Sequence, residues 1–464
     1  MAVQYPTLPG SPTRAHYKRL LWRAGFSASK AQIDHYVSKG LPGAVSELLN
    51  PFTSSVLVGP EPTVDNRRLD PLNEWGHDAV WWIDRMVRSR NQLVERMTLS
   101  LHDLFATSND GVGNTRHMLR QNGLLRRYAL GSFSTLLREI THDPAMLLWL
   151  NGADSSKWEP NENYAREVME LFCLGADPGL EAATYGLWRA SASYSQDDIH
   201  EAARALTGWR YDWNKSQNGT PAERANPTYY STTVHDTGLK TIFGQTGRFT
   251  WEDVCRLVVQ HPNHAPYLCY TLWSYFIPTP PPLGALQMMV RNYRSNSYSL
   301  KTVLGVILRH PDFYANLDAP ALVKPPIVFV AGGLRMLRRY ITHRDWAWIL
   351  AGMGQQPFYP PNVSGWQQGP AFLNTNTVRA YWTAADYLLV NTVSDPGTQT
   401  PDVAVSAAVK AVASPWVSAD GRGKLQAYAQ GFEADHAPLD AHERLERQRV
   451  IRGLLLAGPD GLLH

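Results

Sequence analysis

The stretch Pro160-Asn-Glu-Asn-Tyr-Ala-Arg-Glu-Val-Met-Glu-Leu-Phe-Cys-Leu-Gly175 is both charged and amphipathic. At the helical period its large apolar residues share one face, whereas Asn163, Glu167 and Glu170 share the opposite one. Ionised groups on an element that lies in a core cost several kcal/mol unless each one finds a partner. The stretch therefore predicts an α-helix whose polar face is either a structural network or a site.

The polar residues of this helix have two interpretations. Asn161 as N-cap and Glu162 in the first turn need no chemistry beyond helix capping. Glu167 and Glu170 lie side by side and repel each other unless an arginine, a metal ion or a shared proton intervenes. Arg166 projects between the two faces and can pair with Glu162, four residues earlier. The alternatives are an arginine–carboxylate network and a metal or acid/base site.

Hydrophobic periodicity predicts a mostly α protein with a large multi-helix body. Strand signals are scarce, and the region 209–250, rich in Gly, Asn, Ser, Thr and Tyr, predicts a long irregular or hairpin insertion. The predicted helices cover residues 15–21, 92–105, 118–137, 199–206, 254–259, 265–276, 322–339, 378–389, 403–412 and 442–456.

Composition shifts predict three parts of the chain. A main helical body spans residues 1–393 and carries the insertion at 209–250. A run of Ser, Asp, Pro, Gly and Thr marks a linker at 394–401, and residues 402–464 form a C-terminal helical appendage.

Charge and motif content exclude several classes of protein. The 44 basic and 41 acidic residues give a net charge of +3, which is too balanced for a typical nucleic-acid binder. The three cysteines have no C-x-x-C spacing, so no disulfide framework or zinc knuckle is indicated. No H-E-x-x-H, G-x-S-x-G or phosphate-loop motif is present.

No run of eighteen apolar residues occurs, and the first ten residues lack the features of a signal peptide. We therefore expect no membrane span, and a cytoplasmic location by default. Tryptophan is over-represented, with 16 residues beside 21 tyrosines. These aromatic residues either fill helical cores or form a stacking surface for sugars or peptides.

Two further polar groups are candidates for a site. His102 is either a hydrogen-bonded helix histidine or a metal ligand. His235 and Asp236, followed by Lys240, lie in the long insertion and are either acid/base groups or ligands. The alternative is a turn in which Asp236 binds the backbone two residues further on. The Gly- and Pro-rich loop 352–366 is suited to lining a cleft.

Several motifs, taken in order, resemble a known bacterial family. They are 19–26 (RLLWRAGF), 95–105, 144–147, 161–175, 203–209, His235-Asp236 with Lys240 and Gly244, and Gly354-Gln355 to Gly365-Trp366. From about residue 14 to 390 the chain is similar to the family named domain of unknown function 1800. The resemblance implies a large α-helical protein without an established activity, and some relatives are exported. It also implies a partner from a second, sulfatase-like uncharacterised family.

The chain departs from the family pattern at two histidines. The family motif W-H-N-H-F reads L-H-D-L-F here, and E-L-H-T-L-G reads E-L-F-C-L-G, so Leu104 and Phe172 replace histidines. If those histidines bind a metal in relatives, this chain has lost ligands. Position 172 lies about 160° around the helix from Glu170, so its side chain points away from the carboxylates. The family residues that are intact are His102, Asn163, Arg166, Glu167, Glu170, His235 and Asp236.

These observations predict a polar cleft with hydrolytic or oxidative chemistry. A divalent metal is the candidate cofactor. The alternative is a non-catalytic binding or assembly protein that acts with a partner, a polysaccharide or a peptide. The predicted catalytic residues are Glu167, Glu170, His235 and Asp236; the binding residues are Asn163, Arg166, Lys240, Trp209 and Trp366; the metal ligands are His102, Glu167, Glu170 and His235.

Overall fold

A computed structural model describes residues 3–54, 56–175, 194–392, 395–413 and 415–464. The chain divides into two compact units, each described by itself below. The first unit comprises Met1–Thr7, Met97–His310 and Phe358–Trp366, and the second comprises Leu8–Arg96, Pro311–Pro357 and Gln367–His464.

The first unit is built almost entirely of helices from the middle of the chain. Its elements are α4 (Gln92–Leu104, of which residues 97–104 belong to this unit), α5 (Asn109–Val112), α6 (Thr115–Tyr128), α7 (Phe133–Thr141), α8 (Pro144–Trp149), the 3₁₀-helix η1 (Gly152–Asp154), α9 (Glu162–Glu167), the π-helix η2 (Val168–Cys173), α11 (Gln196–Leu206), β3 (Trp209–Tyr211), α12 (Trp213–Asn218), α13 (Pro221–Ala225), β4 (Thr228–Tyr230), β5 (Lys240–Ile242), β6 (Gln245–Gly247), α14 (Trp251–Gln260), α15 (His264–Ser274), α16 (Leu283–Ser295) and α17 (Leu300–Ile307).

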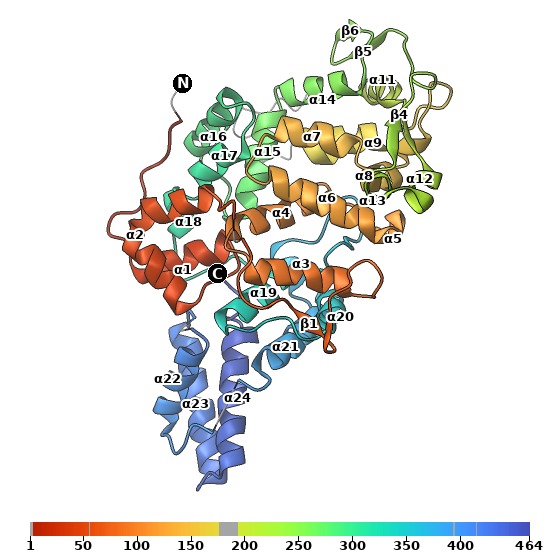
Figure 1. The fold of residues 1–464 in the computed structure, drawn as a ribbon. Coiled ribbons are helices and arrows are strands. Elements are labelled where there is room, and N and C mark those ends of the chain that lie inside the picture. The colour runs from red at the N-terminus through yellow and green to blue at the C-terminus, as the bar shows by residue number, and fades with distance from the viewer. Residues whose placement is uncertain (1–2, 55, 176–193, 393–394, 414) are drawn as a thin grey trace. The chain divides into compact units, whose positions relative to one another are not determined.

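These helices lie in successive rows. Figure 1 shows α14 and α11 above α7 and α9, with α6 in the next row, and neighbouring rows pack against each other. Between the rows Phe105 packs against Phe133 and Phe172, with ring centroids 5.7 and 5.1 Å apart. All three rings are fully buried, so Phe172 lies in the apolar core as its place on the helix predicts.

The region 209–250 contains short antiparallel hairpins, as predicted for the insertion, and also two short helices. Strands β3 and β4 pair with Trp209 opposite Tyr230, and β5 and β6 pair with Lys240 opposite Gly247. Two- and three-residue strands cannot bury a core of their own. They hold loops in place beside α11, and the mostly α fold is confirmed.

The second unit combines residues from both ends of the chain. Its elements are α1 (Arg14–Arg23), α2 (Lys30–Leu49), β1 (Thr63–Val64), β2 (Arg67–Arg68), α3 (His77–Arg88), α18 (Pro311–Tyr314), α19 (Pro326–Met336), α20 (Trp346–Gly352), the 3₁₀-helix η3 (Gly369–Phe372), α21 (Thr375–Leu389), α22 (Pro401–Ala411), α23 (Ala419–His436) and α24 (Ala441–Ala457).

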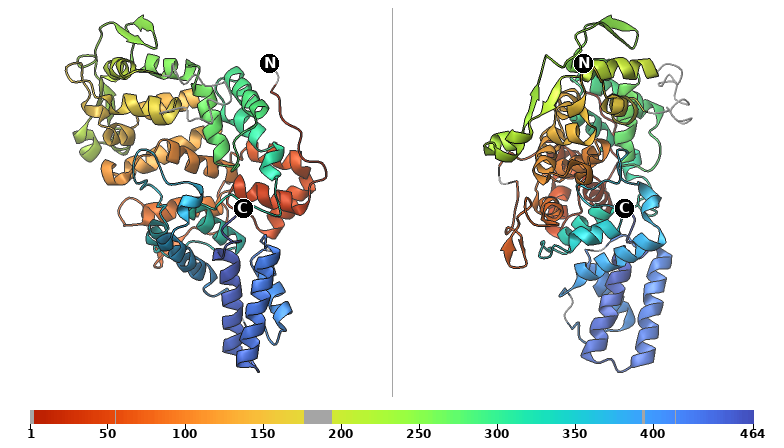
Figure 2. Two further views of the ribbon diagram at one scale, coloured as in Figure 1. Left: turned by 180° about the vertical axis from the view of Figure 1, so that it is seen from behind. Right: turned by 90° about the vertical axis from the view of Figure 1, so that its right-hand side faces the viewer.

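Within this unit α3 packs on α19, which is buried along its whole length. Helices α22, α23 and α24 run side by side, as both views in Figure 2 show, and α24 also packs on α21. The predicted linker 394–401 begins at a residue outside the described ranges. The predicted division into body, linker and appendage stays a prediction.

Two predicted helices differ from the structure at their boundaries. The predicted helix 118–137 is two helices, because Ser132 begins α7 as its N-cap. The predicted helix 322–339 begins only at Pro326, because proline is tolerated in the first helical turn but not in the helix interior, where Pro325 and Pro326 would otherwise lie. Within the described residues, no helix has the length and apolar character that crossing a membrane requires.

Candidate functional site

The helix singled out by the sequence begins as expected. The Asn161 side chain caps α9 by accepting the N–H of Asn163 at 2.9 Å. Arg166 donates to Glu162 at 3.2 Å, and Glu162 also binds Gln196 at 2.7 Å and His200 at 3.1 Å on α11. The predicted pairing of Arg166 with Glu162 is therefore present, and it joins α9 to α11.

Glu167 and Glu170 lie where the α-helix becomes a π-helix, and both are partly exposed. Partial burial and the charge of Glu170 raise the pKa of Glu167, while Arg166 opposes that shift. Burial and the same Glu170 charge raise the pKa of Tyr194 to about 12. A π-turn is rare and often marks a functional position. The charge of Glu170 thus opposes the ionisation of Glu167 and Tyr194 at an unusual helical turn.

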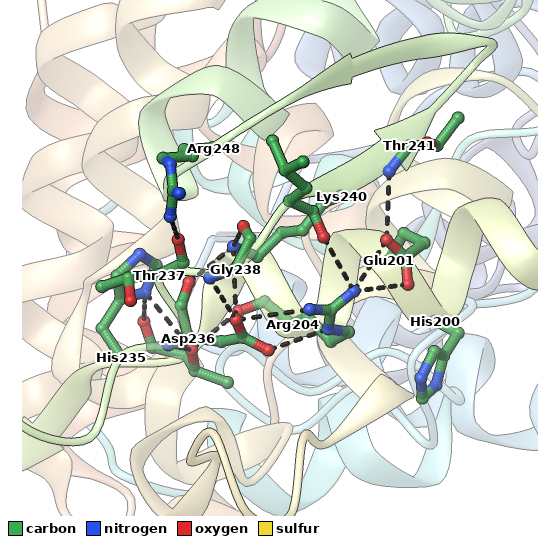
Figure 3. Close-up of polar contacts among 12 residues, drawn as sticks. His200, Glu201, Arg204, His235, Asp236, Thr237, Gly238, Lys240, Thr241 and Arg248 are labelled. Carbon is green, nitrogen blue, oxygen red and sulfur yellow. Dashed lines mark hydrogen bonds and ion pairs between the residues drawn. The ribbon is translucent and has the colours of Figure 1, made fainter.

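The predicted pair His235 and Asp236 is held against α11, as Figure 3 shows. Asp236 accepts Arg204 Nε at 2.8 Å and the N–H of Gly238 at 2.7 Å. The buried Lys240 ammonium donates to the carbonyls of Asp236 and Gly238 and lies 3.7 Å from the Asp236 carboxylate. Burial opposes ionisation of Asp236, but the Arg204 hydrogen bonds are foremost among the contacts that leave its pKa below its usual value.

His235 is buried, and its Nδ1–H donates to the Thr207 carbonyl at 2.8 Å. Burial lowers the pKa of His235, and the Thr207 contact opposes the shift. Arg204 also binds both oxygens of Glu201 at 2.8 and 2.9 Å. Glu201, Arg204, His235, Asp236 and Lys240 are called the fastening cluster below. This cluster holds the loop between β4 and β5 against α11.

Arg204→Lys should lower the free energy of unfolding by about 1–2 kcal/mol, because an ammonium group cannot bind two carboxylates and the Leu239 carbonyl in one plane. Urea titration followed by circular dichroism measures the loss. Arg256→Lys is the matched control, since Arg256 pairs with Asp253 on an exposed helix face and should change stability by less than about 0.5 kcal/mol. Equal effects of the two substitutions would contradict the fastening role.

His102 lies in a separate aromatic environment of the first unit. Its ring contacts Phe358 and Trp366, with centroids 5.8 and 5.4 Å away. The neighbouring Asp103 accepts the Trp366 N–H at 2.8 Å and the Tyr275 hydroxyl at 2.7 Å. Burial lowers the pKa of His102 to about 3, so its imidazole is neutral at physiological pH.

The loop 358–366 reaches Asp103 through a glycine. Gly365 has a φ of +82°, and a Cβ on it would lie 2.5 Å from a carboxylate oxygen of Asp103. The glycine of the Gly365-Trp366 motif is therefore required by both its backbone conformation and this close approach.

The predicted aromatic residue Trp209 stacks on His142 at 4.6 Å and contacts Tyr230, which in turn contacts His235. Trp209 thus lies beside the fastening cluster, whereas Trp366 lies beside His102. Glu167 and Glu170 belong to neither group. Among the described residues, no three His, Cys, Asp or Glu side chains are grouped so that they could hold a metal ion. The structure does not bring the four predicted metal ligands together.

The second unit contains a cavity of about 280 Å³ that is partly open to solvent. Its walls are mostly apolar and come from α1, α2, α19, the residues before α19, the residues between α22 and α23, and the segment after α24. Leu21 and Trp22 lie on α1, Ile33 on α2, Met336 on α19, and Leu463 near the end of the chain.

Lys324 is a buried charged residue of this cavity, with 6% of its surface exposed. Its Nζ donates to the Gly461 carbonyl at 2.5 Å and lies 4.3 Å from the centre of the Trp22 ring. In the described part of the chain, no ion pair joins Lys324 to a carboxylate. Burial lowers its pKa to about 7.

The other charged residues of the lining are also mainly basic. Arg14, Lys18 and Arg19 come from α1, and Asp460 lies on the wall formed by the C-terminal segment. Asp460 accepts the N–H and hydroxyl of Ser418, both at 2.8 Å. The acidic group is thus engaged elsewhere, and the cavity combines an apolar interior with a basic wall.

Most of the sequence matches the model of a known protein family. A family model described as "Protein of unknown function (DUF1800)" matches residues 19–460. The chain belongs to the DUF1800 family. No curated protein and no solved structure matches this DUF1800 chain.

The sequence analysis of this DUF1800 chain missed Trp22 and Lys324. Trp22 lies within the RLLWRAGF motif, and Lys324 is the one charge between Ala319 and Gly333. A lone lysine in a long apolar stretch is a signal, because lysine is almost never fully buried without a reason. The approach of residues 460–464, which buries it, has no signal in the sequence.

Proposed function

We propose that this chain is a binding protein for a small amphipathic molecule and that the cavity lined by Trp22 and Lys324 is its ligand site. The observation that carries the proposal is a buried lysine, without a carboxylate partner, facing a mostly apolar cavity. Apolar pockets with a few converging polar groups and a perturbed titratable residue are the usual form of ligand sites.

The dimensions suit a ligand of moderate size. The cavity has the volume of about nine liquid water molecules, which occupy roughly 30 Å³ each. Gly332 lies close against the Trp22 ring, because a Cβ added to this glycine would lie 2.3 Å from the indole. The ring also stacks against His464. The apolar body of a ligand would therefore lie against the apolar walls, among them Ile33 and Met336, while its polar head reaches Lys324.

Isothermal titration calorimetry with 2-naphthalenemethanol tests this proposal, because the probe has a flat apolar body and one polar head. We expect a Kd on the order of 10–100 µM for twelve non-hydrogen atoms. Ala15→Trp should weaken binding at least tenfold, since Ala15 lines the cavity from an exposed position on α1.

Ala31→Trp is the matched control, because Ala31 is exposed on α2 and does not line the cavity. Its binding should equal that of the wild type. Equal affinities for wild type and both variants, or no heat of binding for any of them, would refute the cavity as the ligand site.

Catalysis at Glu167 and Glu170 is the second candidate function, and the π-turn with its coupled carboxylates is the observation that favours it. The larger cleft predicted from the sequence also needs Asp236 as a catalytic group. The ion pair between Asp236 and Arg204 weighs against that role. The sulfatase-like partner and the polysaccharide or peptide ligand stay predictions.

A further inference from the structure

The environment of Lys324 limits which polar head a ligand can present. The Nζ contacts two groups of the protein itself, the Gly461 carbonyl and the Trp22 ring. Its backbone is fixed as well, since the Lys324 N–H donates to Leu462 O at 2.8 Å and the Lys324 carbonyl accepts the Tyr381 hydroxyl at 2.9 Å. The amine is therefore held at one place in the cavity wall.

We propose that Lys324 condenses with an aldehyde or ketone head of the ligand and holds it as a reversible imine. The inference rests on the proposed function, because the cavity has to bind the apolar body first. The free amine donates one N–H to the Gly461 carbonyl, and protonation of the imine nitrogen restores an N–H for that carbonyl.

The reaction needs no oxidant or cofactor. The Nζ lone pair attacks the carbonyl carbon, a proton moves from nitrogen to oxygen, and a carbinolamine results. Loss of one water molecule then gives the C=N bond. Water reverses both steps, so the ligand is released unchanged.

The protonation state of the amine supports this chemistry. Burial lowers the pKa of Lys324 from 10.5 to about 7, so roughly half of the molecules carry a neutral amine at pH 7. An exposed lysine is neutral in only about one molecule in 3,000 at that pH. Buried lysines of this kind are the ones that proteins use as Schiff-base nucleophiles.

Trapping with 2-naphthaldehyde and sodium borohydride tests the inference, because borohydride reduces an imine to a stable secondary amine. The folded full-length protein is treated at pH 7, digested and mapped by mass spectrometry. We expect one naphthylmethyl group on Lys324, with a yield at least 100-fold above that of an average exposed lysine.

Two variants serve as controls. Lys324→Arg keeps a cation in the cavity and should abolish the adduct, with folding checked by circular dichroism. Lys18→Arg removes the other lysine of the cavity lining and should leave the Lys324 adduct unchanged. The yield should also rise with pH around 7, whereas adducts on exposed lysines rise near pH 10.

The results separate the two proposals. An adduct spread over exposed lysines, or placed on Lys18, with 2-naphthalenemethanol still bound, overturns the imine and leaves the binding site standing. Absence of binding by both the alcohol and the aldehyde overturns the two proposals together.

Discussion

Asp143→Ala is expected to lower the free energy of unfolding by about 3–5 kcal/mol, one of the largest losses that a single substitution in this chain should cause. Asp143 is fully buried and pairs with Arg120, while its Oδ1 accepts Gln121 at 3.1 Å. The same oxygen caps α8 through the N–H groups of Ala145 and Met146. Truncation leaves a guanidinium, an amide and a helix end without their acceptor.

Urea unfolding of the wild type, Asp143→Ala and Asp143→Asn measures this loss. The asparagine variant keeps an acceptor for the helix end and should lose about half as much. Asp212→Ala is the matched control, because Asp212 caps α12 through Lys215 N–H in an exposed position and should cost only about 1 kcal/mol. A loss at Asp143 no larger than at Asp212 would refute the buried network.

Lys324→Met is expected to raise the free energy of unfolding by about 1–3 kcal/mol at pH 7. Burial holds the pKa of Lys324 at about 7 in the folded chain, against 10.5 in the unfolded chain. Between those pH values the unfolded state holds a proton that the folded state releases, so wild-type stability falls as the pH drops from 10.5 towards 7. Methionine removes that cost but also removes the donor to Gly461.

The pH profile decides this prediction. Urea unfolding at pH 7, 8.5 and 10 should show the advantage of the methionine variant shrinking and then reversing, because at pH 10 the wild-type lysine is neutral and still binds Gly461. Lys30→Met, at an exposed position, should change stability by less than about 0.5 kcal/mol at each pH. A methionine variant that is less stable at pH 7 would contradict the unpaired buried charge. A residue that lowers stability in this way is typical of a functional site.

Local signals made the central helix predictable. The Asn161 cap, the Glu162–Arg166 pair and the buried apolar face all follow from spacing along one helix. The switch to a π-helix at Val168 does not, because the same residues are compatible with an α-helix and only their packing selects the wider turn. The helix Ala419–His436 was missed since its small and polar residues give little hydrophobic periodicity.

The candidate sites were predictable only where their residues are close in sequence. His235, Asp236 and Lys240 form one cluster because they share a loop, and the Asx turn to Gly238 follows from local chemistry. The convergence of His102 with the carboxylates was a long-range expectation, and the structure places His102 beside Phe358 and Trp366 instead. Lys324 escaped notice because residues far along the chain bury it.

The pieces of the second unit come from opposite ends of the polypeptide. The Arg23 guanidinium donates to the His464 carbonyl at 3.0 Å, and Val323 forms a β-bridge with Leu463. Contacts between such distant segments must overcome the entropy of closing long loops, which slows their formation. On the ribosome most of the first unit emerges as one continuous stretch, whereas the walls around Lys324 can close only after residue 464 has been added. The proposed ligand pocket therefore matures later than the first unit, whose residues end at Trp366.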